Sequence, residues 1–289
     1  MDWPNSLVKE LAARRCVLFL GSGASAGCSS TVGPASKPPT WEAFLDDLHQ
    51  LLPSFAAKRA VKTLLKNKQY LDAAEIIRRR LSPADFTQYV RDKLVVPRFE
   101  KSKIHEAVLK LDPKVVITTN YDQIYDEYCR SGSAVDGYNI CKYYDDNLVS
   151  ELRSPVRLIV KAHGCVSDAS KIVLSRSDYF TIRQKSVGFF KVLDSLFLTH
   201  TLVFIGYSVS DPDIQIVLEN ANIGVQSSHP HYAVMQRGGV NSEIKEAFQQ
   251  AYNIRFIEFS RGRYDLLESG LDDLVVQVLE YRAEQAGQM

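Results

Sequence analysis

The chain carries six short apolar runs, separated by stretches whose apolar positions recur with a helical spacing. Most runs are rich in Val, Ile and Phe and do not alternate strictly with polar residues, which is typical of strands buried on both faces of a parallel sheet. The pattern therefore predicts an α/β fold built on a doubly wound parallel sheet. The predicted strands are 16–20, 114–119, 156–162, 201–205, 231–235 and 254–259.

The stretch 40–111 differs from the rest, because it holds several helical patterns and no convincing strand. We interpret it as a helical insertion within a single domain spanning 1–289. Ser6 and Thr40 are expected to cap the helices that follow them, since short hydroxylated side chains accept hydrogen bonds from a helix's first N–H groups. The helices predicted within the insertion are 41–52, 55–66, 69–80, 83–94 and 102–111.

Composition and charge exclude several classes of protein. The 289 residues include 35 Lys and Arg against 34 Asp and Glu, a formal net charge of +1, so direct nucleic-acid binding is not expected. No apolar run approaches the roughly 18 residues that a membrane span needs, and no secretion signal opens the chain. The five cysteines include no C-x-x-C pair, so we expect no disulfide framework, no metal site and a reducing, cytoplasmic location.

A glycine motif directly follows the first predicted strand. It reads Gly21-Ser22-Gly23-Ala24-Ser25, with Ala26 as a third small position. Glycines after a strand allow a tight turn and the close approach of a pyrophosphate. The alternative is a tight turn without a ligand. No acidic residue ends a strand about 20 residues on, so a dehydrogenase-type cofactor geometry is not favoured.

Three further turns follow predicted strands at the edge where ligands gather in open α/β sheets. The first, TTNYD, contains Thr119, Asn120 and Asp122, of which Asp122 could simply cap the next helix. The second is His163-Gly164, and histidine is the default proton acceptor near neutral pH. The third contains Gly206 and Ser208, which could contact a ribose or phosphate or act as caps.

Other features carry no chemistry in this interpretation. We take the basic run Arg78-Arg79-Arg80 as a solvated helix face rather than a nucleic-acid site. The other histidines lack a comparable strand-end context. There is no Walker A lysine, which excludes the usual P-loop site.

The four turns in this order resemble the signature series of the sirtuins, which reads G-A-G-x-S, Q-N-x-D, H-G and G-[TS]-S. The spellings TNYD and GYSxxD look most like the sirtuin-like NADases of bacterial antiphage systems, and the resemblance covers roughly 14–260. The chain lacks the two zinc-binding C-x-x-C pairs of protein-deacylating sirtuins and has Thr119 where they have glutamine. The resemblance therefore implies NAD+ cleavage rather than deacylation.

The resemblance also implies roles for individual residues in a Rossmann-like, sirtuin-type domain with NAD+ as its substrate. Asn120 and His163 would be the catalytic residues, with His163 as the base. The remaining residues would bind the different parts of the dinucleotide. They are Gly21, Gly23, Ala24 and Ser25 at the pyrophosphate, Thr119 and Asp122 near the nicotinamide and its ribose, and Gly206 and Ser208 on the adenosine side.

The implied activity is hydrolysis of NAD+ to nicotinamide and ADP-ribose, which depletes cellular NAD+ in abortive infection. By the same resemblance, we expect homo-oligomers and a separate activating chain such as a HerA-type ATPase, since the chain ends at residue 289. Two alternatives stay open. One is an NAD-dependent deacylase or ADP-ribosyltransferase, and the other is a non-catalytic module that senses NAD or ADP-ribose.

Overall fold

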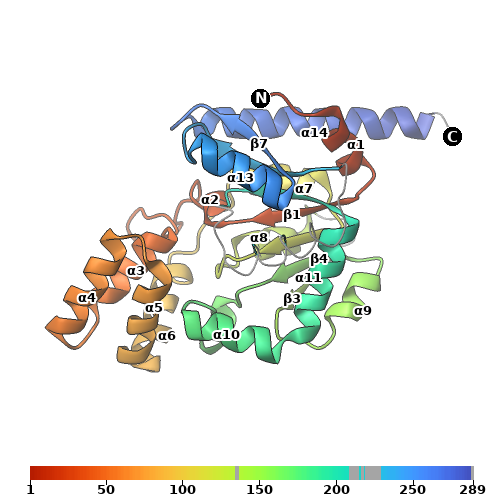
Figure 1. Cartoon of the computed structure of the whole chain (residues 1–289). Coiled ribbons are helices and arrows are strands. Elements are labelled where there is room, and N and C mark those ends of the chain that lie inside the picture. The colour runs from red at the N-terminus through yellow and green to blue at the C-terminus, as the bar shows by residue number, and fades with distance from the viewer. Residues whose placement is uncertain (134–136, 208–214, 216–217, 219–228, 288–289) are drawn as a thin grey trace.

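The architecture comes from a computed structural model that describes residues 1–133, 137–207, 215, 218 and 229–287. In these ranges seven parallel strands form one sheet in the order β3-β4-β2-β1-β5-β6-β7, which confirms the predicted α/β fold class (Figure 1). The strands are β1 (Cys16–Leu20), β2 (Val115–Thr118), β3 (Tyr138–Lys142), β4 (Arg157–Lys161), β5 (Thr201–Ile205), β6 (His231–Gln236) and β7 (Ile254–Phe259).

The strand β3 is absent from the sequence-based prediction. It lies at the edge of the sheet and pairs only with β4 among the described strands. Its sequence YNICK mixes polar and apolar residues, and only Tyr138 and Cys141 are buried. An edge strand that is covered incompletely does not need the continuous apolar run by which central strands are recognised.

Helices cover both faces of the sheet (Figure 1). The residues Leu18 and Leu20 of β1 face one layer, and Val17 and Phe19 face the other, as the alternation of a strand requires. The first layer contains α1 (Asn5–Ala12), α7 (Lys103–Leu111), α8 (Ile124–Tyr128) and α14 (Tyr264–Gly287). The second contains α9 (Leu148–Arg153), α10 (Arg176–Lys185), α11 (Val187–Thr199) and α13 (Ser242–Tyr252).

Four helices between β1 and β2 form a lobe with its own apolar core, beside the carboxyl edge of the sheet (Figure 1). They are α3 (Trp41–Gln50), α4 (Phe55–Lys66), α5 (Tyr70–Arg80) and α6 (Pro83–Leu94). Ile172 and Leu174, from the segment before α10, complete that core. Helix α7, which the expected insertion includes, packs instead against α14 in the sheet layer.

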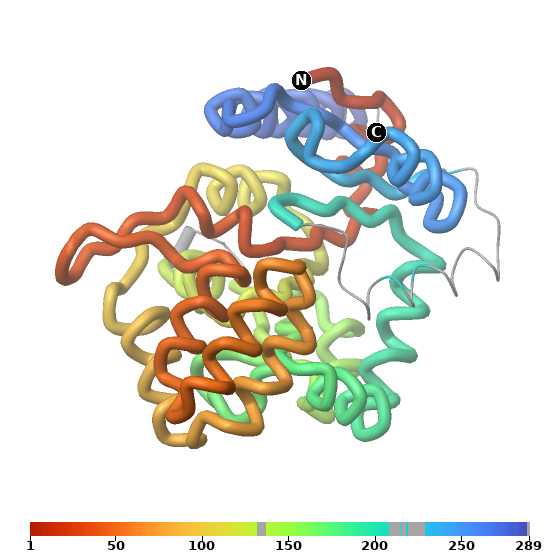
Figure 2. Tube along the Cα trace, turned by 60° about the vertical axis from the view of Figure 1, so that its left-hand side comes forward, coloured from red at the N-terminus to blue at the C-terminus, as the bar shows by residue number. Residues whose placement is uncertain are grey.

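The two connections that join this lobe to the sheet run side by side. Ser30 and Phe99 form an isolated antiparallel bridge between them. The backbone N–H of Thr31 donates to the carbonyl of Pro97 at 3.1 Å, and that of Glu100 donates to Ser29 at 3.0 Å. The lobe therefore leaves and re-enters the sheet domain through one paired neck. Figure 2 shows α1 and α14, the first and last helices of the chain, next to each other on a different side of the molecule from the lobe.

The helix starts were predicted with mixed success. Thr40 caps α3 as expected, because its hydroxyl accepts from the N–H of Ala43 at 3.3 Å. Ser6 does not cap α1, since the helix already begins at Asn5 behind Pro4. The hydroxyl of Ser6 lies 3.0 Å from the hydroxyl of Tyr232 instead. A hydrogen bond to β6 therefore replaces the expected bond to a backbone N–H of α1.

All five cysteines are buried free thiols. Among the helices of the described ranges, none combines the length and the apolar character that a bilayer crossing requires.

The buried His105 makes the stability of the fold dependent on pH. It occupies the third position of α7, where its Nδ1 accepts from the backbone N–H of Ser102 at 3.2 Å in a capping box. Burial lowers the pKa of His105 to about 4; the nearby Asp126 opposes this shift and Lys161 adds to it. The folded state therefore binds the proton more weakly than the unfolded state, whose pKa lies near 6.5.

We predict that the contribution of His105 to the free energy of unfolding is complete above about pH 6.5 and decreases as the pH drops toward 4. At pH 4.5 the loss from this residue should be roughly 2 kcal/mol. Urea unfolding at several pH values measures the slope. The His105→Gln variant should show a shallower slope, because glutamine serves the capping box without titrating. Identical slopes in the two proteins would contradict the assignment.

Candidate active site

Thr118, the last residue of β2, ties together three strand ends at the carboxyl edge. Its hydroxyl donates to the carbonyl of Leu20 at the end of β1 at 2.9 Å, and its own carbonyl accepts from the N–H of Ala162 beyond β4 at 2.9 Å. The same hydroxyl accepts from the N–H of Asn120 at 3.0 Å. The turns that follow β1, β2 and β4 therefore start at one level, which brings the glycine motif, TTNYD and His163 to adjacent positions.

The glycine turns after β1 and β5 are in backbone contact. The N–H of Gly23, in the short helix α2 (Ser22–Ser25), donates to the carbonyl of Gly206 at 2.9 Å. Gly206 has a φ of +62°, and a Cβ there would lie 2.3 Å from the nitrogen of Ala24. A Cβ at Gly21 would lie 2.4 Å from the Gly206 carbonyl oxygen. The close approach of two backbones thus already requires these glycines, in addition to any role toward a phosphate.

The side chain of Asn120 joins the second turn to the first. Its Nδ2 donates to the carbonyl of Gly21 at 3.0 Å and to the hydroxyl of Ser25 at 3.2 Å. Asn120 is half-buried, and its Oδ1 accepts no hydrogen bond from the part of the chain that the structure describes. The amide is therefore held by its donor end and presents an acceptor that a substrate hydroxyl or a water could use.

Beneath Asn120, the buried Asp122 continues the same network. Its Oδ2 accepts from the hydroxyl of Ser25 at 3.1 Å, while Oδ1 accepts from the N–H of Ile124 at 3.1 Å. The second bond is local and reaches the first residue of α8, but Asp122 is not the N-cap expected from the sequence, because Gln123 occupies that position. The first is a long-range contact that fixes Ser25, and through Ser25 it fixes the amide of Asn120.

A buried lysine that sequence reasoning missed supports this loop. Lys161, the last residue of β4, has a side chain that is only 1% exposed. Its ammonium donates to the backbone carbonyl of Asp122 and lies 3.4 Å from Oδ2 of Asp126, which is also 1% exposed. Burial raises the pKa of the Asp126 carboxyl, although Lys161 opposes the shift. For Lys161 burial lowers the pKa, but the surrounding carboxylates outweigh it and the net shift is upward.

His163 follows β4 at the strand end next to Asn120. It is 5% exposed, and its ring packs edge-on against Tyr179 of α10 with 5.2 Å between centroids. Its carbonyl accepts from the N–H of Val173 at 3.0 Å. Gly164 has a φ of +82°, and a Cβ there would lie 2.5 Å from the carbonyl of Lys171. The chain therefore folds back tightly behind the imidazole, which accounts for the glycine of the H-G pair.

Most of the predicted residues lie in this region. Ala24 is fully buried and its N–H donates to the carbonyl of Gly21 at 2.9 Å, while Thr119 is half-buried beside Thr118. Ser208 lies outside the described residues, so its predicted role is left as it stands. No group of three or more His, Cys, Asp or Glu side chains suited to a metal occurs among the described residues.

Comparison with known proteins agrees with this architecture. Residues 114–257 match the SIR2-like domain. The match begins one residue before β2 and includes TTNYD, His163 and Gly206, whereas the glycine motif and the lobe precede it.

Individual relatives carry related names. The chain is 28% identical over 174 residues to an NAD(+) hydrolase ThsA of Enterococcus faecium, covering 60% of this chain and 34% of that protein. It is 27% identical over 207 residues to Defense-associated sirtuin 2 of Bacillus subtilis, covering 71% of this chain and 19% of that protein. An NAD(+) hydrolase ThsA of Acinetobacter baumannii is 24% identical over 233 residues, covering 80% and 44%. The chain thus spans less than half the length of each of these relatives.

The contact between the glycine turns predicts a large cost for a side chain at Gly206. Gly206→Ala should destabilise the protein by several kcal/mol, because the methyl group meets backbone that cannot move aside. Gly238→Ala is the matched control, since Gly238 has a similar φ of +74° with nothing within 4 Å of its Cβ position. Chemical denaturation should give a loss of only about 1 kcal/mol for the control. Equal losses would show that the turns are not in contact.

The buried pair predicts a distinct pattern of stability. Lys161→Met should cost about 3–5 kcal/mol, because it leaves Asp126 buried without its ammonium. A second substitution, Asp126→Leu, should recover much of that loss. Lys114→Met is the control, since Lys114 bonds to the carbonyl of Val156 at 2.7 Å at the opposite end of the strands. Denaturation midpoints measure the series, and a double variant that is no better than Lys161→Met would refute the pairing.

Proposed function

We propose that this protein is an NAD+ glycohydrolase that cleaves NAD+ to nicotinamide and ADP-ribose. The observation that carries the proposal is the network from Gly21 through Asn120 and Ser25 to Asp122, at the strand end adjacent to His163. The names of the ThsA relatives support the same chemistry. The position also suits a dinucleotide, because β1 and β5 flank the point where successive strands switch sides of the sheet.

The reaction needs little acid assistance at the leaving group. Nicotinamide departs with the bonding electron pair as a neutral molecule from a cationic substrate, through an oxocarbenium-like transition state. A water oxygen forms the new bond to the ribose carbon, and one proton is released. The protein must hold the ribose, exclude bulk water from the nicotinamide and place one water correctly.

Asn120 is suited to orienting the ribose or the water. Its amide is fixed by two donated hydrogen bonds, so the acceptor Oδ1 has a set direction. Because that direction is established before the substrate binds, its ordering cost is not incurred during the reaction. The buried carboxylate of Asp122 lies on the same network and adds negative charge near a substrate whose scissile end is cationic.

His163 is proposed to accept the proton from the water or from a ribose hydroxyl. Its ring is held edge-on by Tyr179, and its backbone is held by Val173. A positioned base of this kind contributes on the order of 10²–10⁴-fold to the rate.

We further propose that the activity serves antiphage defence by depleting cellular NAD+. The relative named Defense-associated sirtuin 2 supports this context. An unregulated hydrolase would harm its own cell, so we propose that activity depends on assembly, either of several copies or with a separate activating chain such as a HerA-type ATPase. Activity assays with and without the products of neighbouring genes test this dependence.

The catalytic assignments predict large losses of turnover without unfolding. Asn120→Ala and His163→Ala should each lower kcat by about 10²–10⁴-fold, since each removes a group that acts on the water or the ribose. NAD+ consumption with chromatographic identification of products measures this, and thermal melting checks the fold. His229→Ala is the control histidine, because His229 is exposed and far in sequence from the strand-end turns.

The product profile separates the proposal from its alternatives. Free ADP-ribose and nicotinamide in equal amounts indicate hydrolysis. Consumption of NAD+ only in the presence of an acylated peptide indicates deacylation, and binding of NAD+ without products indicates a sensing module. Full activity in either alanine variant would overturn the assignment of residues.

A further inference from the structure

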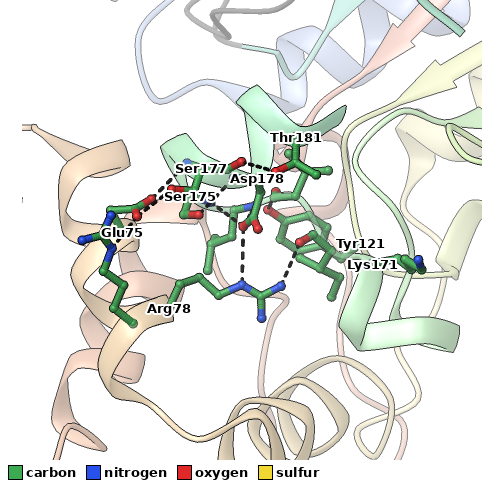
Figure 3. Close-up of polar contacts among 12 residues, drawn as sticks. Glu75, Arg78, Tyr121, Lys171, Ser175, Ser177, Asp178 and Thr181 are labelled. Atoms are coloured by element: carbon green, nitrogen blue, oxygen red, sulfur yellow. Dashed lines mark hydrogen bonds and ion pairs between the residues drawn. The ribbon is translucent and has the colours of Figure 1, made fainter. Parts of the chain in front are cut away.

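The first arginine of the run Arg78-Arg79-Arg80 is partly buried and paired, contrary to the expectation from the sequence, whereas Arg79 and Arg80 are exposed. Arg78, on α5 of the lobe, points across to the segment before α10 (Figure 3). Its Nη2 donates to the carbonyl of Ile172 at 3.2 Å, and its Nε donates to Oδ2 of Asp178 at 3.4 Å. Its guanidinium also lies 4.4 Å from the ring centroid of Phe86 on α6.

The dipeptide that Arg78 holds is in direct contact with both proposed catalytic loops. The N–H of Val173 donates to the carbonyl of His163 at 3.0 Å. The carbonyl of Val173 accepts from the hydroxyl of Tyr121, the neighbour of Asn120, at 2.7 Å. Residues 172–173 thus form a strap with three attachments, one to the lobe, one to the histidine turn and one to TTNYD.

The same carboxylate that pairs with Arg78 also organises α10. Oδ2 of Asp178 accepts from the backbone N–H of Ser175 at 2.9 Å, which caps the helix. Helix α10 begins directly after Ser175 and carries Tyr179, whose ring packs against His163. Arg78 is therefore connected to His163 by two chains of contacts. One runs through the strap at residues 172–173, and the other runs through Asp178 and the start of α10.

Further contacts between the same elements align α5 with α10 (Figure 3). Glu75 accepts from the N–H and the hydroxyl of Ser177 at 3.0 and 2.7 Å. Asp72 accepts from Arg176 at 3.0 Å. The Asp72–Arg176 pair is exposed, and exposed ion pairs contribute little on their own. These contacts keep the two helices in register, so that Arg78 meets its two acceptors together.

We propose that Arg78 is a positioning residue for NAD+ cleavage, which holds His163 and the loop of Asn120 in their working arrangement from the helical lobe. The inference rests on the proposed function. It assigns to the lobe a part in catalysis, since one of its side chains sets the geometry of the reacting groups. A lysine could not replace the arginine fully, because only a planar fork can donate to a carbonyl and a carboxylate while stacking on a ring.

The kinetic test compares Arg78→Gln and Arg78→Lys with Arg80→Gln. Arg80 is exposed at the end of the same helix and serves as the matched control. Arg78→Gln should lower kcat on the order of tenfold with KM changed by less than about twofold, because misplaced reacting groups slow the chemical step. Arg78→Lys should restore part of the loss. The control should match the wild type.

A double-mutant cycle with Tyr121→Phe separates positioning from a general loss of structure. Both substitutions release the same strap, so their combined effect on kcat should be smaller than the product of the single effects. A combined effect equal to that product, or a loss of kcat matched by the same loss of folded protein, would overturn the proposal.

Hydrogen exchange gives a readout that does not depend on activity. Arg78→Gln should speed the exchange of the Val173 amide, on the order of tenfold, while Arg80→Gln should leave it unchanged. If the wild type did not cleave NAD+, the proposed function would be wrong. The hydrogen-exchange measurement would still show whether Arg78 holds residues 172–173 in place. If the wild type cleaved NAD+ but Arg78→Gln changed neither kcat nor exchange, the role of Arg78 would be refuted.

Discussion

The arrangement of the candidate site depends on the three hydrogen bonds of Thr118. A hydroxyl that both donates to β1 and accepts from Asn120, together with a carbonyl that accepts from Ala162, sets the level at which three strands stop. A β-branched residue suits the end of a buried parallel strand, and a hydroxyl in place of a methyl supplies the extra bonds. The convergence of distant turns is therefore a consequence of strand register.

Much of the scaffold could be predicted because its signals are local. The strands at 16–20, 201–205 and 254–259 have the predicted bounds, and so do α4 and α6, whose starts carry the capping serines Ser54 and Ser82. The edge strand β3 could not be found this way, because its exposure removes the continuous apolar signal. The sequence of a strand indicates how far that strand is buried. It does not indicate which of its edges lacks a neighbouring strand.

The supporting groups of the site were harder to foresee. Lys161 sits inside an apolar run and gives no sign that its ammonium is buried against Asp126 and a carbonyl. Arg78 looks like its two basic neighbours, and only the tertiary structure distinguishes it. The strand-end turns were recognisable because their short sequences follow apolar runs. The charges that hold those turns come from partners 35 or more positions away, and periodicity carries no information on such pairs.

The paired neck between Ser30 and Phe99 places the entry and the exit of the lobe side by side. Because its entry and exit lie together, the helices between them can be exchanged or lengthened without changing how β1 meets β2. The two connections meet the sheet at the same positions whatever helices the lobe contains. A lobe of different length or sequence would preserve the contact with the site only if it kept a side chain able to reach the carbonyl of Ile172.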